Sequence, residues 1–291
     1  MTSTSDAPPA DLDGRLADLA ALLTPLPGVL VAFSGGVDSG VLLAAAVRTL
    51  GADRVVAATA VSPSLPASEL GPAAAFAASL GVRHERPRTD ELSREGYRAN
   101  AGDRCAFCKT ELVDVLTPLA ARLGIADVVT GTNADDLRAG FRPGIRAAAE
   151  RGAWAPLARA GMTKDDVRAA ARRWGLTLAD KPAAACLASR IAYGVPVSAE
   201  RLARVEAAEV ALREALTGAG LPVANLRVRD LGPVEGAEVA RVEVDPALVD
   251  TVALRPELLA AVAGFDRVEL DPRGFRSGSM NELLPDPVRY R

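Results

Sequence analysis

The pattern of apolar and polar residues divides the chain near Arg190. Before that point, short apolar runs bounded by turn residues predict buried parallel strands at residues 29–33, 54–61, 82–86 and 127–131. The stretches around these runs have helical spacing and predict helices at residues 12–23, 38–50, 67–80, 108–123 and 163–174. Strands that alternate with helices predict an α/β fold, a parallel sheet with helices on both faces.

After Arg190 the pattern is that of a small α+β unit. Residues 193–196 are typical of a linker, and Ser198 is placed to cap a long helix that runs to about Thr217. Two alternating strands, a helix and a last strand follow, at residues 226–231, 238–244, 247–262 and 267–270. Gly232-Pro233 predicts a turn after the first of these strands. The sequence therefore predicts an α/β domain over residues 1–190 and a smaller C-terminal α+β domain over residues 191–291.

Composition narrows the class of protein. The 291 residues are 49% apolar and 4% aromatic, which is typical of a globular, helix-rich protein with small core side chains. A net charge of −3 gives no overall attraction to nucleic acid, so nucleic acid is not an expected partner. No apolar run approaches the roughly 18 residues of a membrane span, and residues 1–12 lack the basic start and apolar core of a signal peptide. We therefore expect a cytoplasmic protein without a membrane partner.

The numbers of cysteines and histidines limit the chemistry. Three cysteines are too few for a disulfide framework and suit a reducing compartment. The single histidine, His84, excludes a two-histidine metal site, and we interpret it as an ordinary half-exposed residue of a strand. Catalysis must then depend on cysteine, carboxylates, arginine and a bound nucleotide.

A glycine turn, Ser34-Gly35-Gly36-Val37-Asp38-Ser39, follows the first predicted strand and opens a helix. We call these six residues the phosphate turn, because glycines allow a sharp bend and the amides at a helix start favour an anion. No lysine of the GxxxxGK[ST] type follows, so the turn is not a P-loop. The alternative is an ordinary capped turn between a strand and a helix. The motif resembles the pyrophosphatase motif of PP-loop ATPases, which implies transfer of AMP to an oxygen of the substrate.

Other candidate ligands follow the second and fourth predicted strands. Ligands of open α/β sheets bind beyond the carboxyl ends of the strands, so these loops are expected to meet the phosphate turn. Ser62 is placed to hold adenine through backbone groups, and Asn133 to contact ATP. Asp38 is the better candidate for Mg²⁺, whereas Asp135 and Asp136 equally fit a helix cap. For Ser62 the alternative is an ordinary turn at the end of a strand.

The cysteines form a third constellation. Cys105 and Cys108 are spaced to lie on one side of a turn, and Cys186 is far away in sequence. Flanking Arg104 and Lys109 would favour thiolate. The alternatives are buried free thiols, a redox pair, or a structural zinc with His84 as the only imidazole ligand. We favour an iron–sulfur cluster with one iron open, because the adenylation implied by the phosphate turn requires a nucleophile such as sulfide.

Three arginines are candidates for binding a substrate phosphate. Arg227 and Arg229 are two residues apart in a predicted strand, so their side chains share one face. With Arg276 they would bind phosphate by bidentate contacts. The alternative is a set of solvated arginines at a sheet edge.

Several motifs together resemble the LarE family of ATP-dependent sulfurtransferases over nearly the whole chain. They are the phosphate turn, Phe141-Arg142-Pro143-Gly144, residues 186–190 with Tyr193-Gly194, Arg227-Val228-Arg229, Ala240-Arg241-Val242-Glu243, and residues 274–278 with Met280-Asn281. The resemblance implies that ATP adenylates a carboxylate of pyridinium-3,5-biscarboxylic acid mononucleotide and that sulfur then replaces AMP. The product is a thiocarboxylate of a nickel-pincer cofactor.

The resemblance also implies roles for single residues. Members of this family either sacrifice the sulfur of one cysteine, matching Cys186, or hold a 4Fe-4S cluster on three cysteines that carries a transferable sulfide. Cys105, Cys108 and Cys186 together resemble the second type. The substrate phosphate would be bound by Arg227, Arg229 and Arg276, with Ser189 and Arg190 acting nearby. Glu243 and Asp250 are less specific matches, and the family assembles as hexamers.

Two other functions are compatible with the sequence. Some PP-loop tRNA thiolases also combine a CxxC with a third cysteine, although the acidic balance of the chain argues against RNA binding. The alternative that is not an enzyme is a nucleotide-binding module that zinc stabilises and that catalyses no reaction. Retention of tRNA would support the first, and one zinc without ATP–pyrophosphate exchange the second.

Overall fold

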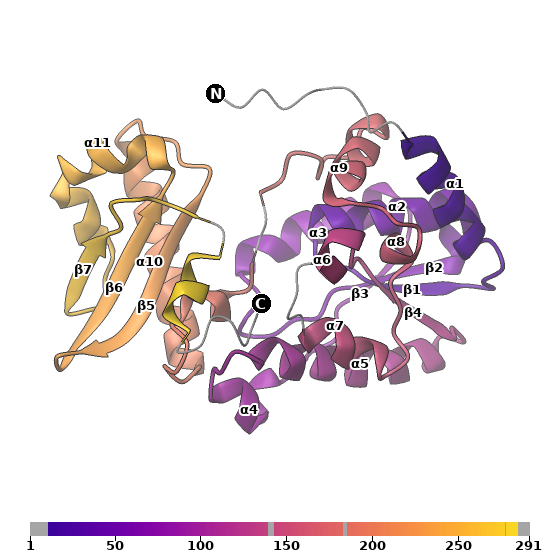
Figure 1. Ribbon diagram of the computed structural model, residues 1–291, viewed down its shortest axis with the longest axis horizontal. Helices are drawn as coiled ribbons and strands as arrows, with labels where there is room; N and C mark the ends of the chain where they lie inside the picture. The colour runs from indigo at the N-terminus through magenta and orange to yellow at the C-terminus, as the bar shows by residue number, and fades with distance from the viewer. Residues whose placement is uncertain (1–10, 139–142, 183–184, 277, 285–291) are drawn as a thin grey trace.

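The computed structural model describes residues 11–138, 143–182, 185–276 and 278–284 (Figure 1). Phe141, Arg142 and Ser277 of the family motifs lie outside the described residues. No helix in the described ranges is both long and apolar enough to cross a bilayer. The strands are β1 (Val29–Ala32), β2 (Val55–Ala58), β3 (Arg83–Glu85), β4 (Asp127–Thr130), β5 (Leu226–Val234), β6 (Ala237–Val244) and β7 (Arg267–Leu270). The α-helices are α1 (Leu12–Leu23), α2 (Val37–Leu50), α3 (Ala67–Ser79), α4 (Glu95–Arg98), α5 (Arg104–Arg122), α6 (Ala134–Arg138), α7 (Pro143–Ala149), α8 (Pro156–Arg159), α9 (Lys164–Arg173), α10 (Ala199–Gly218) and α11 (Val249–Ala253).

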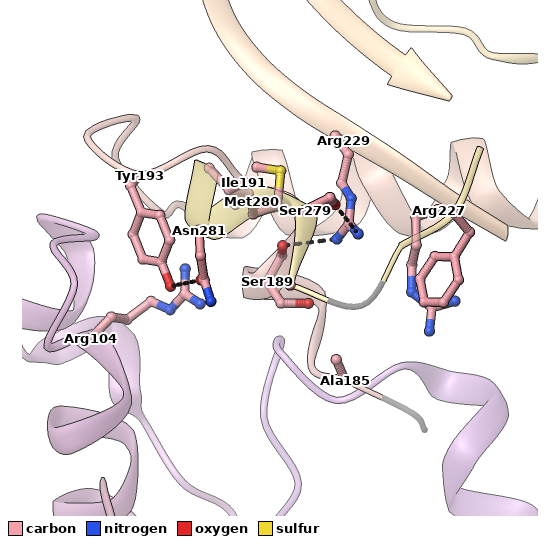
Figure 2. A pocket seen from close by; sticks show the side chains of 12 residues that line it. Arg104, Ala185, Ser189, Ile191, Tyr193, Arg227, Arg229, Ser279, Met280 and Asn281 are labelled. Atoms are coloured by element: carbon pink, nitrogen blue, oxygen red, sulfur yellow. Dashed lines mark hydrogen bonds between the residues drawn. The ribbon is translucent and has the colours of Figure 1, made fainter. Parts of the chain in front are cut away.

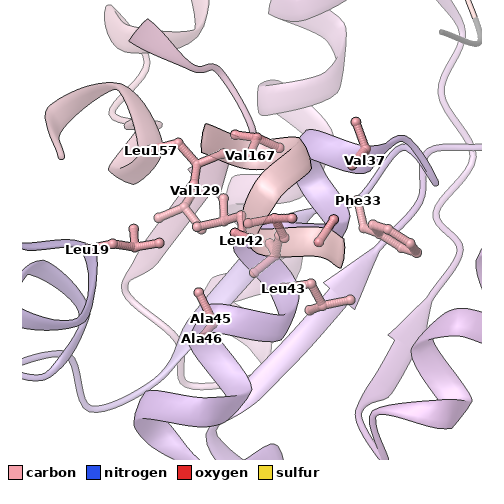
Figure 3. Close-up of a cluster of buried hydrophobic side chains, with 14 of the residues drawn as sticks. Leu19, Phe33, Val37, Leu42, Leu43, Ala45, Ala46, Val129, Leu157 and Val167 are labelled. Carbon is pink, nitrogen blue, oxygen red and sulfur yellow. The ribbon is translucent and has the colours of Figure 1, made fainter. Parts of the chain in front are cut away.

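The first sheet is parallel, with the strand order β3-β2-β1-β4. Successive residues of a strand point to opposite faces, so Val29 and Val31 enter one core and Leu30 enters another. The first core lies under α1, α2 and α9 and includes Leu42 and Val167 (Figure 3). The second lies under α5. Helices on both faces confirm the predicted α/β class.

The order of strands places the candidate site. β2 follows β1 in the chain and lies on one side of it, whereas β4 lies on the other side. The chain therefore runs to opposite sides of β1 in its two halves, and the order of strands reverses at the carboxyl end of β1. Such a switch point is where open α/β sheets bind ligands. The phosphate turn begins there, with only Phe33 between it and β1.

The C-terminal sheet has the order β5-β6-β7, with β5 and β6 antiparallel and β6 and β7 parallel. The helix α10 begins at the predicted cap, where Ser198 Oγ accepts the amide of Arg201 at 3.2 Å. It packs against β5, and the core between them includes Leu212, Leu226 and Val228. This part confirms the predicted smaller α+β unit.

Two predictions about the first strand of this unit are wrong. Gly232-Pro233 forms no turn, because the register shifts between Asp230 and Gly232 and β5 continues through a bulge to Val234. The turn lies at Glu235-Gly236, where both residues have positive φ. The predicted strand is also not half-exposed, since its first five residues are all buried. A bulge explains the error, since glycine is typical of both bulges and turns, and proline is tolerated at a sheet edge.

The single helix predicted at residues 247–262 is interrupted. The α-helix α11 ends at Ala253, and a 3₁₀ segment, Pro256–Ala261, follows it. Pro256 explains the break, because proline lacks the amide that an α-helix needs and its ring crowds the preceding turn.

Candidate functional site

The phosphate turn is a closed structure built from its own hydroxyls. Ser39 Oγ accepts the amide of Ser34 at 3.2 Å and donates to the carbonyl of Gly36 at 3.1 Å. Gly35 has φ +74°, and a Cβ at that position would lie 3.3 Å from the Cβ of Ala73. The first amides of α2 have no partner within the helix and are thus available to an anion. The turn is thus closed by its own hydrogen bonds, and anion binding by its amides stays a prediction.

The loop after β4 meets the phosphate turn. Asn133 Nδ2 donates to Asp38 Oδ1 at 3.0 Å, which brings together two of the residues that the sequence assigned to ATP and its Mg²⁺. Asn133 and Asp136 also form a reciprocal cap of α6, with side chain to amide distances of 3.0 and 3.2 Å. The acidic cluster therefore caps a helix. Through Asn133 the same loop reaches the turn.

Two lysines that the sequence analysis missed lie at the phosphate turn. Lys164 Nζ forms an ion pair with Asp38, and its own amide donates to Asp135 Oδ2 at 2.8 Å. Lys181 Nζ donates to the carbonyl of Gly35 at 3.0 Å and pairs with Glu69 at 2.5 Å. Both lysines bring positive charge to the phosphate turn. Local motif spacing could not reveal them, because they are 126 and 146 residues away from their partners in the turn.

The loop after β2 lies against the segment that carries Cys186. Ser62 Oγ accepts the amide of Ser64 at 3.2 Å, and the carbonyl of Ser64 accepts the amide of Leu187 at 2.8 Å. Ser64 Oγ also forms a hydrogen bond with the buried hydroxyl of Tyr97. These contacts bring the predicted adenine position close to Cys186. The adenine role of Ser62 stays a prediction.

The structure gathers the three cysteines into one neighbourhood. Cys105 and Cys108 lie in the first two turns of α5, and Cys186 directly precedes the 3₁₀ segment Leu187–Arg190. All three are free thiols; Cys105 and Cys186 are exposed, and Cys108 is half-buried. Burial raises the pKa of Cys108 to about 12, and the neighbouring Cys186 and Cys105 thiols add to the shift.

The cysteines fit an iron–sulfur cluster in the kind of ligand that they supply. Thiolates are the ligands that such clusters require, and three thiols would leave one iron open. Over the described ranges, however, no three His, Cys, Asp or Glu side chains are already arranged to hold a metal ion. The site is thus a set of neighbouring thiols and not a preassembled metal centre.

His84 is engaged elsewhere. Its Nε2 lies 2.8 Å from Thr59 Oγ1, which donates to the carbonyl of Phe33 at 2.7 Å. The hydroxyl therefore accepts from Nε2, and burial, with Arg86 nearby, lowers the pKa of His84. This role in joining β2 and β3 matches the structural interpretation of His84 and disfavours it as a zinc ligand.

A pocket of about 160 Å³ lies between the cysteine-bearing part of the chain and β5 (Figure 2). Arg104 and Tyr193 stand at one end, and Arg227 and Arg229 project from β5 at the other. The lining residues are Arg104, Ala185, Ser189, Ile191, Tyr193, Arg227, Arg229, Phe275, Gly278, Ser279, Met280 and Asn281. We call this the arginine pocket.

Arg229 belongs to a buried network in the arginine pocket. Its guanidinium donates to Glu243 Oε2 at 2.7 and 3.0 Å and to the carbonyl of Ser189 at 3.1 Å. Ser279 Oγ donates to Glu243 Oε1 at 2.7 Å and accepts from Arg229 Nη2 at 3.2 Å, so it connects the two side chains. Arg229 is 5% exposed and Glu243 1% exposed, so neither is a solvated edge residue. The network holds Arg229 in a fixed orientation at the pocket wall.

Arg227 has a less favourable electrostatic environment. It is 8% exposed and stacks over Phe275 at 5.1 Å. Burial, together with the neighbouring Arg190, lowers the pKa of Arg227 to about 10. An anion in the pocket would reverse this effect, because it would compensate the buried charge.

The remaining predicted residues lie around the pocket. Arg190 forms a bidentate pair with Glu209, at 2.9 and 3.1 Å, and donates to the carbonyl of Cys186 at 3.1 Å. Ser189 Oγ donates to that same carbonyl at 2.7 Å. Arg276 pairs with Glu282 beside the pocket. Exposed Asp250 lies on α11 and not among the pocket residues. Arg190 and Ser189 thus hold the main chain at Cys186.

Together, the fold and this site define a Rossmann-like α/β protein with a nucleotide-type turn, three neighbouring thiols and an arginine pocket formed with a second, mixed sheet. No family model matches the chain. It is 41% identical, over 94% of its length and 99% of the relative's, to an uncharacterised protein of Synechocystis. It is 34% identical, over 94% of its length and 96% of the relative's, to the pyridinium-3,5-bisthiocarboxylic acid mononucleotide synthase of Lactiplantibacillus plantarum. An uncharacterised protein of Methanocaldococcus jannaschii is 26% identical over 86% of the chain and 91% of its own length. The chain belongs to the LarE family, that of the Lactiplantibacillus synthase.

Proposed function

We propose that the protein is an ATP-dependent sulfurtransferase that converts a carboxylate of pyridinium-3,5-biscarboxylic acid mononucleotide into a thiocarboxylate. A carboxylate oxygen attacks the α-phosphorus of ATP, and pyrophosphate leaves. Sulfide sulfur then attacks the acyl carbon, and the bond to AMP breaks. Each cycle consumes one ATP and one sulfide and releases AMP and pyrophosphate. The name of the Lactiplantibacillus relative supports this product class.

One observation carries the proposal. The segment from Lys181 to Ser189 contacts the phosphate turn at its start, where Lys181 donates to Gly35. At its end, Ser189 lines the arginine pocket. Cys186 lies between them and is exposed. A sulfur-bearing residue therefore stands on a short connection between an ATP-type site and an anion-type site.

The residues divide the work between the two sites. The amides of the phosphate turn and Lys181 would hold the pyrophosphate of ATP, and Asp38 would bind its Mg²⁺ in exchange for Lys164. Arg227 and Arg229 would bind the substrate phosphate. The buried wall of the pocket would exclude water from the acyl adenylate, and so limit its hydrolysis.

For the sulfur source we propose a 4Fe-4S cluster on Cys105, Cys108 and Cys186. Such a cluster, when bound, supplies an open iron that carries a transferable sulfide. A second candidate is sacrifice of the Cys186 sulfur, which the exposure of Cys186 favours. By resemblance to the family, we also propose that the protein acts in the cytoplasm as a homohexamer, which light scattering would test.

Anaerobic turnover with the pyridinium substrate, ATP, Mg²⁺ and sulfide tests the proposal. Wild-type protein is expected to contain iron and to release AMP together with thioacid over many turnovers. The double variant Cys105→Ser/Cys108→Ser separates the two sulfur sources, because it removes the cluster and keeps Cys186. Loss of thioacid in this variant supports the cluster. A single turnover with loss of one sulfur and two hydrogens at Cys186 supports sacrifice, and absence of AMP and thioacid from wild type refutes the function.

A further inference from the structure

Asn100 has an unusual backbone in a fully buried place. It lies between α4 and α5, has φ +54° and is 0% exposed. Within the described ranges, the one other non-glycine residue with positive φ is Glu235, at +53° in the exposed turn between β5 and β6. A turn at the surface explains Glu235. The conformation of Asn100 requires a different explanation, since a left-handed residue is costly unless its surroundings hold it.

The side-chain amide of Asn100 supplies that explanation. Its Nδ2 donates to the carbonyls of Ala192 at 2.8 Å, Val195 at 2.7 Å and, more weakly, Ile191 at 3.4 Å. The carbonyl of Asn100 accepts the amide of Gly194 at 3.2 Å. The residue therefore holds a whole loop from the other side of the site.

Arg104 extends this contact to the cysteines. One nitrogen of its guanidinium, Nη1, donates both to Asn100 Oδ1 and to the carbonyl of Ala188, the latter at 2.8 Å. Arg104 is 4% exposed and is the first residue of α5, directly before Cys105. Ala188 is two residues after Cys186. Asn100 and Arg104, which we call the clamp, thus join the helix that carries two cysteines to the segment that carries the third.

The clamped loop is also attached to the arginine pocket. The amide of Ala192 donates to the carbonyl of Asp230 at 2.8 Å, and Ile191 forms a β-bridge with Asp230. Asp230 directly follows Arg229 in β5. The clamp therefore connects α5, the segment after Cys186 and the strand of the phosphate-binding arginines.

We infer that Asn100 and Arg104 are positioning residues that hold Cys105 and Cys108 against Cys186. Their importance for sulfur transfer rests on the proposed function, whereas the positioning itself does not. The Asn100 amide donates to three carbonyls of one loop. Arg104, the other residue of the clamp, therefore does not replace it.

Thiol proximity gives a direct test that requires neither iron nor substrate. In a Cys105→Ser background, Cys108 and Cys186 are the only thiols. Equilibration with reduced and oxidised glutathione, followed by mass spectrometry, measures their effective concentration as the Cys108–Cys186 disulfide forms and two glutathiones are released. Asn100→Gly keeps the backbone conformation accessible but deletes the amide. We expect it to lower the effective concentration by at least about tenfold.

Glu235→Gly is the matched control, because it also replaces a left-handed residue by glycine but lies in the exposed turn between β5 and β6 and not in the clamped loop. It is expected to leave the effective concentration unchanged. Arg104→Met is the second variant if Asn100→Gly does not fold, and Arg104→Lys is expected to restore part of the loss by donating to Ala188. Equal effective concentrations of the Cys108 and Cys186 thiols in the Cys105→Ser parent and in its Asn100→Gly and Arg104→Met variants would overturn the inference.

Iron content separates this inference from the proposed function. In the three-cysteine protein purified anaerobically, Asn100→Gly is expected to retain less iron than Glu235→Gly. If even wild type contains no iron but the glutathione result holds, the cluster is refuted and the clamp stands. If wild type and Asn100→Gly retain equal iron and equal thiol proximity, the clamp is refuted and the cluster stands.

Discussion

Replacing Gly131 by alanine tests whether the phosphate turn depends on its close contact with β4. Gly131 follows the last residue of β4. A Cβ on Gly131 would lie 2.6 Å from the amide nitrogen of Ser39, 2.8 Å from its Cα and 3.0 Å from the carbonyl carbon of Asp38. These are backbone atoms, so no rotation of a side chain relieves the contact.

The size of the effect follows from those distances. Ordinary contact of a Cβ begins at 3.4 Å, so Gly131→Ala forces the backbone of the phosphate turn away from β4. A displacement of about 1 Å at a reacting centre costs roughly 100-fold in rate. We therefore expect ATP-dependent AMP formation to fall by about that factor, with the arginine pocket unchanged.

The assay compares AMP formation and ATP binding in Gly131→Ala and Gly71→Ala. Gly71 lies in α3 with nothing within 4 Å of its Cβ position, so alanine there is expected to keep activity and to stabilise the helix by about 0.5–1 kcal/mol. Circular dichroism and thermal melting verify that both variants are folded. A folded Gly131→Ala with wild-type ATP affinity and AMP formation would refute the role assigned to this contact.

Three more predictions concern charge at the two sites. Lys181→Met is expected to raise the KM for ATP by roughly tenfold or more, as measured by steady-state AMP release, and Lys181→Arg is expected to recover part of that loss. An unchanged KM would exclude Lys181 from ATP binding. Arg227→Met is expected to raise the stability of the ligand-free protein by about 1 kcal/mol, because it removes a buried cation, while substrate affinity falls; calorimetry that shows lower stability would contradict this. Alkylation of Cys108 is expected to accelerate about tenfold per pH unit above pH 8, because its thiolate forms only near the raised pKa. The folded state keeps this proton after the unfolded chain loses it, so stability also falls between about pH 9 and 12, and flat profiles would contradict the prediction.

The sequence predicted those parts of the site that depend on local pattern. The phosphate turn is recognisable because an apolar strand, two glycines and a helix start adjoin one another in the chain. The start of the helix predicted at residues 163–174 is equally local, because Thr163 and Asp166 form a capping box there. The shared face of Arg227 and Arg229 follows from the two-residue period of a strand.

The rest depends on contacts between distant residues. Lys181 is recognisable as a partner of Gly35 only once the fold is known, because nothing in its own sequence neighbourhood marks it. Asn100 is indistinguishable from any other loop asparagine until its carbonyl partners are seen. Gly232 was misassigned for the opposite reason, since its local signal for a turn is strong and pairing with β6 overrides it.

Contacts of the main chain fix the length of the segment Ala185–Ser189. The amide of Leu187 donates to the carbonyl of Ser64 at 2.8 Å, and the carbonyl of Ser189 accepts from Arg229 at 3.1 Å. An inserted or deleted residue between Leu187 and Ser189 would shift one of these groups by about 3.5 Å, more than a hydrogen bond tolerates. Substitutions in this segment are therefore more tolerable than changes in its length, and homologous chains that share the chemistry are expected to preserve its residue count.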